Sequence, residues 1–249
     1  MNMIFKLVKK EAILNYNIST IIWCICAVGM YFIPNYPSYI GMFYILLAMM
    51  MIFQLGQGAN DIVYSVLLPV RKVDTVSARF LYCALLEVGI LIVSLVACFI
   101  RRSSGYPVNM AGIGLNVAYY GLQLVILSIV NIVFLGNVYK NPAKVGKPFL
   151  ISSILYFVFY AICELPIWVY NAMVSNLVKE GFEPEIAATE VLIDKPAIAL
   201  ERIGVYIKAM DSAGQLKQIP VLIAGIVIYA VTWAIVYKRA CKQFQAYDI

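Results

Sequence analysis

Histidine is missing from this 249-residue chain, and charged residues make up only 13% of it. The absence of histidine removes the commonest proton shuttle and metal ligand among the side chains. Soluble domains normally carry about a quarter charged residues, so this deficit, with a mean hydropathy of +0.87, indicates an integral membrane protein. The net charge of +6 comes without runs of basic residues interleaved with aromatics, which argues against nucleic acid as a partner.

Motifs for nucleotide chemistry and catalysis are also missing. The nearest approach to a phosphate-binding loop is Asn141–Pro148, but it lacks the first glycine and ends in proline, which has no hydroxyl for magnesium. Cys24 and Cys26 have the wrong spacing for a zinc knuckle and fall in an apolar run. We therefore expect no enzyme activity, no metal and no cofactor in this chain, so that any ATP and magnesium must be bound by another subunit.

Long apolar runs are what the chain has instead, and each needs about 20 residues to cross a bilayer. No second domain or internal repeat is evident, so residues 1–249 are predicted to form a single all-α transmembrane domain. The runs predict six transmembrane helices at Ile18–Ile33, Tyr39–Gln57, Phe80–Ile100, Gly114–Val138, Phe149–Tyr170 and Ile219–Val236.

Residues 1–17 precede the first apolar run and are too mixed for a cleavable signal peptide. Lys6, Lys9 and Lys10 fall on one side of a helical projection and apolar residues on the rest, which predicts an amphipathic helix in the membrane interface. Glu11 and Ile13 do not fit this pattern. A frayed basic N-terminus is the alternative.

Basic residues set the expected orientation, because cytoplasmic loops carry an excess of lysine and arginine. With the N-terminus inside, the two termini and most of the 19 basic residues are cytoplasmic. Arg101 and Arg102, at an outer span end, are the local exception. The inner bases are Lys6, Lys9, Lys10, Arg71, Lys72, Arg79, Lys140, Lys144, Lys147, Lys238, Arg239 and Lys242.

The largest polar stretch is residues 171–216, between the last two spans. Ala187–Ile193 and Ile198–Ile207 place apolar patches between charges, a pattern that favours short amphipathic or re-entrant helices at the outer face. A disordered loop would contain fewer Ile, Leu and Val residues.

Two acids, Glu87 and Glu164, lie within predicted spans, where a charge is costly and usually faces the bundle interior or a water path. Glu87 is expected to pair internally, whereas Glu164 is a candidate for a transport path or for the outer interface. Either acid could serve a proton-coupled carrier, which is the alternative function. The candidates for the path are Gln54, Tyr156, Tyr160 and Glu164.

Residues 61–79 join the second and third spans and carry three basic and two acidic residues. Pro69 suits the first turn of a helix, and Val70, Val73 and either Val76 or Ala78 form an apolar edge, so a short cytosolic helix is predicted over Leu67–Val76. Its charges could dock a partner, or the segment could only anchor the orientation.

The order of these features resembles the bacterial type-2 ABC exporter permeases. Asp61 closes the second span, Leu67–Lys72 reads LLPVRK, and Arg79-Phe80 opens the third span, which is similar to that family's LP-x-x-R-K segment and the R-Y/F that follows it. The basic N-terminal helix, the six spans and the long final outer segment fit as well. In size the chain looks most like the permease subunit of phenol-soluble modulin exporters.

The resemblance implies a permease in the bacterial cell membrane that pairs with a second permease copy, as a homodimer or with a paralogue, and with separate ATPase subunits. It implies export of amphipathic peptides or other apolar cargo, with the second and fifth spans bordering the path. The segment that would seat in the ATPase comprises Leu67, Leu68, Pro69, Val70, Arg71, Lys72, Val73 and Asp74.

Overall fold

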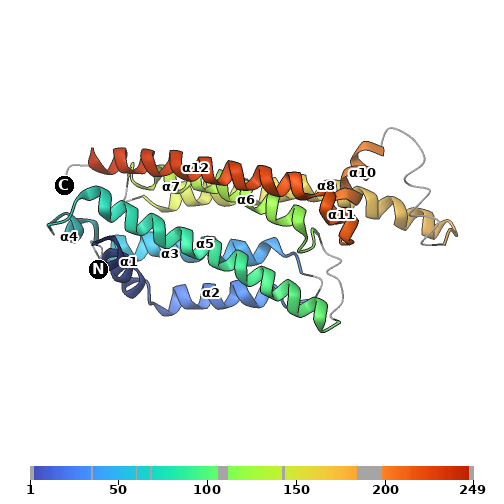
Figure 1. Ribbon diagram of the computed structural model, residues 1–249, viewed down its shortest axis with the longest axis horizontal. Coiled ribbons are helices and arrows are strands. Elements are labelled where there is room, and N and C mark those ends of the chain that lie inside the picture. The colour runs from blue at the N-terminus through green and yellow to red at the C-terminus, as the bar shows by residue number, and fades with distance from the viewer. Residues whose placement is uncertain are drawn as a thin grey trace.

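The computed structural model describes residues 3–34, 36–59, 61–67, 69–105, 112–141, 144–183 and 198–246, and within these ranges every regular element is a helix. The long helices lie side by side in an elongated bundle (Figure 1). They are α1 (Met3–Leu14), α2 (Ile18–Met30), α3 (Tyr39–Gly58), α4 (Asp61–Leu67), α5 (Lys72–Ser103), α6 (Val117–Val133), α7 (Leu135–Val138), α8 (Gly146–Lys179), α10 (Ile198–Lys208), α11 (Ser212–Lys217) and α12 (Ile219–Gln245).

Five of these segments are long and apolar enough to cross a membrane, namely α3, α5, α6 with α7, α8 and α12. The sixth candidate is α2 joined to α1. The pair bends by 90°, and α2 alone has 13 residues, or about 20 Å of helix. The all-helical membrane fold predicted from the sequence is confirmed, and α1 lies at a right angle to α2, as an interfacial helix would.

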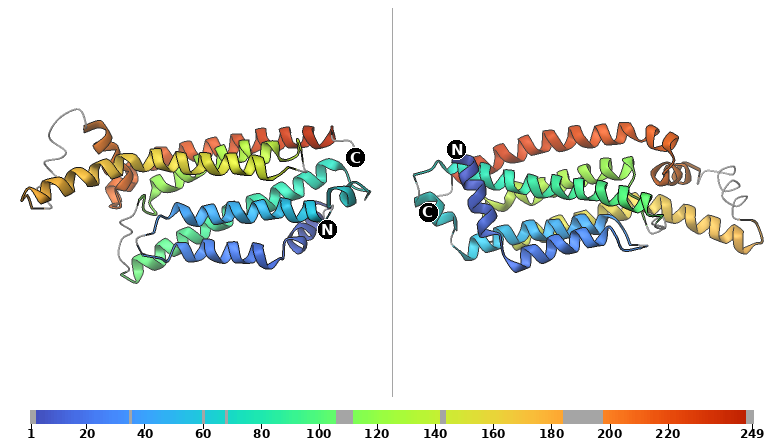
Figure 2. Two further views of the ribbon diagram at one scale, coloured as in Figure 1. Left: turned by 180° about the vertical axis from the view of Figure 1, so that it is seen from behind. Right: turned by 60° about the horizontal axis from the view of Figure 1, so that its bottom comes forward.

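The two ends of the bundle differ. The α1 and α4 helices and the C-terminal end of α12 gather at one end, and α10 and α11 pack at the other, where α8 projects beyond the bundle (Figures 1 and 2). We call the first the α4 end and the second the α11 end. The basic segments predicted to be cytoplasmic lie at the α4 end. They are α1, the start of α5, the start of α8 and the C-terminal end of α12 (Figure 1).

Side-chain caps explain where several helices begin. The Asn17 side chain accepts a hydrogen bond from the Ser19 amide at 3.1 Å at the start of α2, and Asn116 accepts one from Tyr119 at 2.9 Å at the start of α6. These bonds satisfy amides that have no partner within the helix. A short polar side chain before an apolar run therefore fixes where each of these helices starts.

Glycine allows the closest helix crossing, between α6 and α12. A Cβ on Gly225 would lie 2.4 Å from the carbonyl oxygen of Gly121, and one on Gly121 would lie 2.6 Å from that of Val221. Small residues let membrane helices approach to backbone contact, where close packing replaces the hydrophobic driving force. This crossing joins the fourth and sixth spans near the starts of α6 and α12, toward the α11 end of the bundle (Figure 1).

The predicted helix over Leu67–Val76 is wrong in its boundaries. The chain forms α4 before this segment, bends at Pro69 and Val70, and starts α5 at Lys72. Proline has no amide hydrogen to donate and disfavours a helical conformation in the residue before it. Pro69 therefore separates two helices here rather than opening one.

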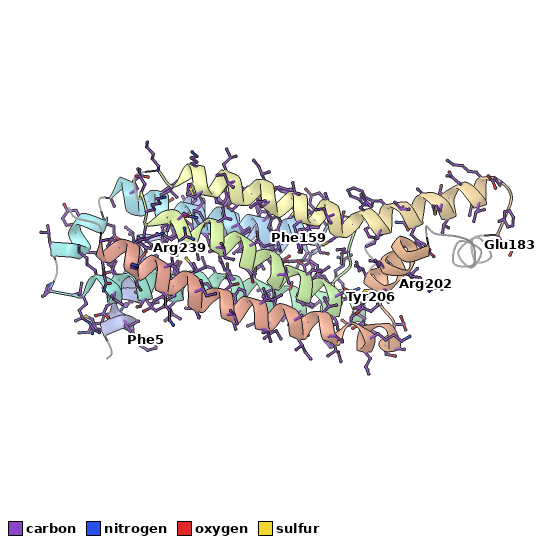
Figure 3. The ribbon with its side chains drawn as sticks, turned by 90° about the horizontal axis from the view of Figure 1, so that it is seen from above. Phe5, Phe159, Glu183, Arg202, Tyr206 and Arg239 are labelled. Atoms are coloured by element: carbon purple, nitrogen blue, oxygen red, sulfur yellow. The ribbon has the colours of Figure 1, made fainter. Side chains whose placement is uncertain are left out.

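The outer segment also differs from its prediction. Helix α8 does not stop near Tyr170 but continues through Pro166 to Lys179. Residues 198–208 form the predicted amphipathic helix as α10, while Ala187–Ile193 lies outside the described residues. Figure 3 shows Arg202 and Tyr206 of α10 beside the projecting half of α8.

Candidate coupling site at the α4 end of the bundle

A buried ion network joins α1, α4 and α5. Arg79 donates from Nε and Nη2 to the two carboxylate oxygens of Glu11, at 3.1 and 3.2 Å, and its Nη2 also contacts Asp61 Oδ2 at 2.5 Å. Lys10 Nζ lies 2.7 Å from Asp61 Oδ1 and 3.1 Å from Ser65 Oγ. Two cations balance two carboxylates, so the charges are paired although Arg79 and Glu11 are almost completely buried.

The walls around Arg79 are shaped for its guanidinium group. The Phe53 ring centre lies 5.5 Å from the guanidinium carbon, within the range of a cation–π contact. A Cβ on Gly56 would lie 3.4 Å from Arg79 Nη2, so a larger residue there would crowd the group. Arginine fits this site better than lysine, because its planar fork can pair with two carboxylates at once.

The outward side of the same region is exposed and partly apolar. Tyr64 and Leu67, one helical turn apart on α4, are 66% and 77% exposed. Arg71 extends into solvent and donates from Nε and Nη2 to the Asp74 carboxylate, each at 3.0 Å. This bond raises the pKa of Arg71 above its ordinary value, so the guanidinium stays charged at any physiological pH. A large apolar pair beside a fixed charge is typical of a surface that docks another protein.

The predicted docking residues are only partly at this surface. Leu67, Pro69 and Arg71 are exposed, and Lys72, Val70, Val73 and Asp74 are half-buried. Leu68 lies outside the described residues. The third valine of the predicted apolar edge, Val76, is fully buried in the core.

The predicted path residues do not share one surface either. Tyr156, Tyr160 and Glu164 are buried along α8, whereas Gln54 is exposed on α3. The Tyr156 hydroxyl donates to the Tyr39 carbonyl at 2.7 Å, and the Tyr160 hydroxyl donates to Gln123. These aromatic residues pack α8 against α3 and α6 in this conformation.

The two intramembrane acids both have partners. Glu87 Oε2 accepts from Tyr229 at 2.6 Å and from Asn131 at 3.3 Å, which is the internal pairing expected from the sequence. Glu164 Oε1 accepts from the Ile113 amide at 3.4 Å toward the α11 end of the bundle.

Sequence reasoning missed several residues that hold the site and the bundle together. Glu11 was visible only as a misfit in the amphipathic pattern, and Tyr64 only by its spacing from Leu67. Arg101, the apparent orientation exception, is buried and donates to the Tyr31 carbonyl at 3.1 Å, where α2 ends. Gln218 accepts from the Ala118 amide and donates to the backbone of the α10 region, and no sequence signal pointed to it.

Comparison with known proteins decides the family. A model of the ABC-2 family transporter proteins matches residues 6–193, more than half of the chain. The chain belongs to the ABC-2 family. No curated protein and no solved structure matches it with significance.

As an ABC-2 permease, the chain is the non-catalytic, multi-pass membrane component of an ABC transporter, and its family membership implies an ATPase partner. The match includes α1, α4 and α5, so the buried ion network and the exposed face of α4 both lie within the part of the chain that carries the family signal.

Proposed function

We propose that this ABC-2 permease exports amphipathic peptides or other apolar cargo, driven by a separate ATPase that docks on the exposed face of α4 and the following bend. The observation that carries the proposal is the pairing of this exposed surface, Tyr64, Leu67 and Arg71, with the buried network directly behind it. Surfaces that only anchor a loop need neither large exposed apolar side chains nor an internal brace.

The buried network gives a physical route for force. A push on α4 reaches Asp61, and Arg79 joins Asp61 both to Glu11 on α1 and to the start of α5. Separating these groups would leave buried charges unpaired, which is costly. The three helices are therefore expected to move as one body when the ATPase subunits close.

The same proposal covers assembly and location. The α4 end would face the cytoplasm of a bacterial cell, because it collects the basic segments. A second permease copy would complete the transporter, with the half-buried face of α3 and the exposed face of α8 bordering the path between them. The exposed aromatic residues of α8, Phe157 and Trp168, and the resemblance to phenol-soluble modulin exporters support a bulky amphipathic cargo.

A charge exchange tests the docking surface. In the variant with Arg71→Glu and Asp74→Lys the ion pair is reversed but kept, so the local fold should survive while the charge pattern shown to the ATPase is inverted. We expect the variant to be inserted normally, yet to lose copurification of the ATPase or to lose export of an amphipathic test peptide while hydrolysis continues.

The matched control exchanges an exposed pair at the other end of the bundle, Lys179→Glu with Glu180→Lys, and should behave as wild type. Wild-type ATPase binding and wild-type peptide export in the Arg71/Asp74 variant would contradict the docking proposal. Loss of both functions in the control variant as well would contradict its assignment to the α4 end.

A further inference from the structure

A groove of about 480 Å³ lies on the outside of the bundle at the α11 end, between α5, α6 and α12. Its walls are apolar and include Leu91, Leu95 and Phe99 of α5, Leu124 of α6, and Leu222 and Ile226 of α12. The volume falls within the range of about 300–1,000 Å³ typical of small-molecule sites. The wall residues belong to segments that cross the membrane, so the groove opens toward lipid.

Four polar residues line this groove, namely Arg102, Asn116, Tyr120 and Gln215, and the Tyr120 hydroxyl accepts a hydrogen bond from Ser94. Asn116 donates to the Ile207 and Ala209 carbonyls, and Gln215 donates to the Met210 carbonyl, so their amide groups are already engaged. Arg102 also lines the groove and makes no hydrogen bond or ion pair with the described part of the chain. The groove therefore combines a long apolar body with a single available guanidinium group.

We propose that this groove binds one anionic phospholipid, with its phosphate on Arg102 and an acyl chain along α5 toward Leu91. Arg102 lies eleven positions after Leu91 on the same helix, which gives about 16 Å of apolar length for the acyl chain. Arginine pairs with phosphate through two parallel hydrogen bonds, and basic pockets between transmembrane helices recognise anionic headgroups. The lipid belongs to the leaflet at the α11 end.

The charge distribution favours a lipid over a protein occupant. The acids within the apolar spans, Glu87 and Glu164, are buried, so a spanning helix of a second copy would bring apolar side chains but no exposed carboxylate to Arg102. A free anion would use the guanidinium group but leave the apolar walls exposed, since Leu95, Phe99 and Ile226 are at least half exposed. Only an amphiphile with one anionic head matches both parts. Arg102 also lies in the last turn of α5, where a cation suits the helix dipole, so its role needs a test that depends on phosphate.

The test is native mass spectrometry of the detergent-purified protein titrated with dioleoyl phosphatidylglycerol or with dioleoyl phosphatidylcholine. Wild type should retain phosphatidylglycerol at about ten-fold lower concentration than Arg102→Ala, the loss expected for a charge-assisted contact. Phosphatidylcholine retention should be weaker and unchanged by the substitution. Arg102→Lys should restore part of the preference, and Lys179→Ala, which removes an exposed base from the end of α8, should change nothing.

A second variant, Leu95→Trp, fills the apolar wall without touching Arg102 and should reduce retention of both lipids. Equal retention of the two lipids by wild type would mean a nonspecific boundary lipid only and would overturn the proposal. Equal phosphatidylglycerol retention by wild type and Arg102→Ala would overturn it as well. Displacement of the lipid by dimerisation of the protein would assign the groove to a second copy instead.

Discussion

At the scale of single residues, Arg79 is the centre of the α4 end. It was expected to be one more cytoplasmic base, yet it is buried and shared between Glu11 and Asp61. Its sequence position gave the correct end of the bundle but not the burial, because Glu11 lies 68 residues away and its approach depends on how α1 crosses α5. The misfit of Glu11 in an otherwise amphipathic helix was the available signal, since an acid on an apolar face requires a buried partner.

Removing Arg79 should be strongly destabilising. Arg79→Leu would leave two buried carboxylates facing one partly exposed lysine, and breaking a buried pair in this way costs about 3–5 kcal/mol. Thermal unfolding of the purified protein in detergent should show a clear fall in Tm. Arg71→Leu is the control, because the Arg71 side chain is 84% exposed and the loss of such an ion pair should lower Tm far less than the loss of Arg79. Equal Tm values for wild type and Arg79→Leu would contradict the bracing role of the network.

At the scale of elements, the sequence predicted which segments are helical better than where each helix ends. Apolar length and periodicity are local properties, so the spans and α10 were found. The bend at Pro69 and the continuation of α8 through Pro166 depend on what surrounds each proline. Pro69 lies in solvent at the end of the bundle, whereas the backbone of Pro166 packs against Gly204 of α10, where a Cβ would lie 2.7 Å from the Pro166 carbonyl oxygen. Tertiary packing keeps the second proline inside a helix.

For the candidate site too, the sequence predicted the segment better than the boundaries of its helices. The segment was located by its charge and its LPVRK motif, but the helix that presents Tyr64 and Leu67 begins earlier than predicted. Exposure cannot be inferred from a motif alone, because Val76 and Arg71 come from the same short stretch and have opposite burial.

The α6–α12 crossing yields a prediction at this scale. Gly225→Ala would press a methyl group against the backbone of Gly121, and overpacking of this kind costs about 1–3 kcal/mol. We expect a lower Tm and weaker insertion or accumulation of the protein. Gly89→Ala on α5 is the matched control, since the added Cβ would meet no packed neighbour within 4 Å beyond its own helix backbone, and it should be neutral or slightly stabilising. A Tm for Gly225→Ala equal to that of Gly89→Ala would show that this crossing is not tightly packed.

At the scale of the whole molecule, the two ends have different chemistry. The α4 end carries the buried network and the exposed face of α4 that we propose as the docking surface, while at the α11 end polar side chains form hydrogen bonds with the backbone of neighbouring elements. Asn116 and Gln218 both donate to the Ala209 carbonyl, which ties the starts of α6 and α12 to the connection between α10 and α11. This asymmetry suits a transporter that receives force at the α4 end and keeps α10 and α11 packed on the bundle at the α11 end.

A further prediction concerns which side of the membrane each end of the bundle faces. Ser103, exposed at the end of α5, lies at the α11 end, and Arg71 lies at the α4 end, so cysteines introduced at the two positions should report opposite sides of the membrane. With an impermeant thiol reagent on whole cells, Ser103→Cys should be labelled and Arg71→Cys should not, and permeabilisation should make Arg71→Cys reactive. Wild type, with its six native cysteines, supplies the background signal. The reverse pattern would place the docking face outside the cell, where no ATP-driven partner could reach it, and both the orientation and the coupling proposal would fail together.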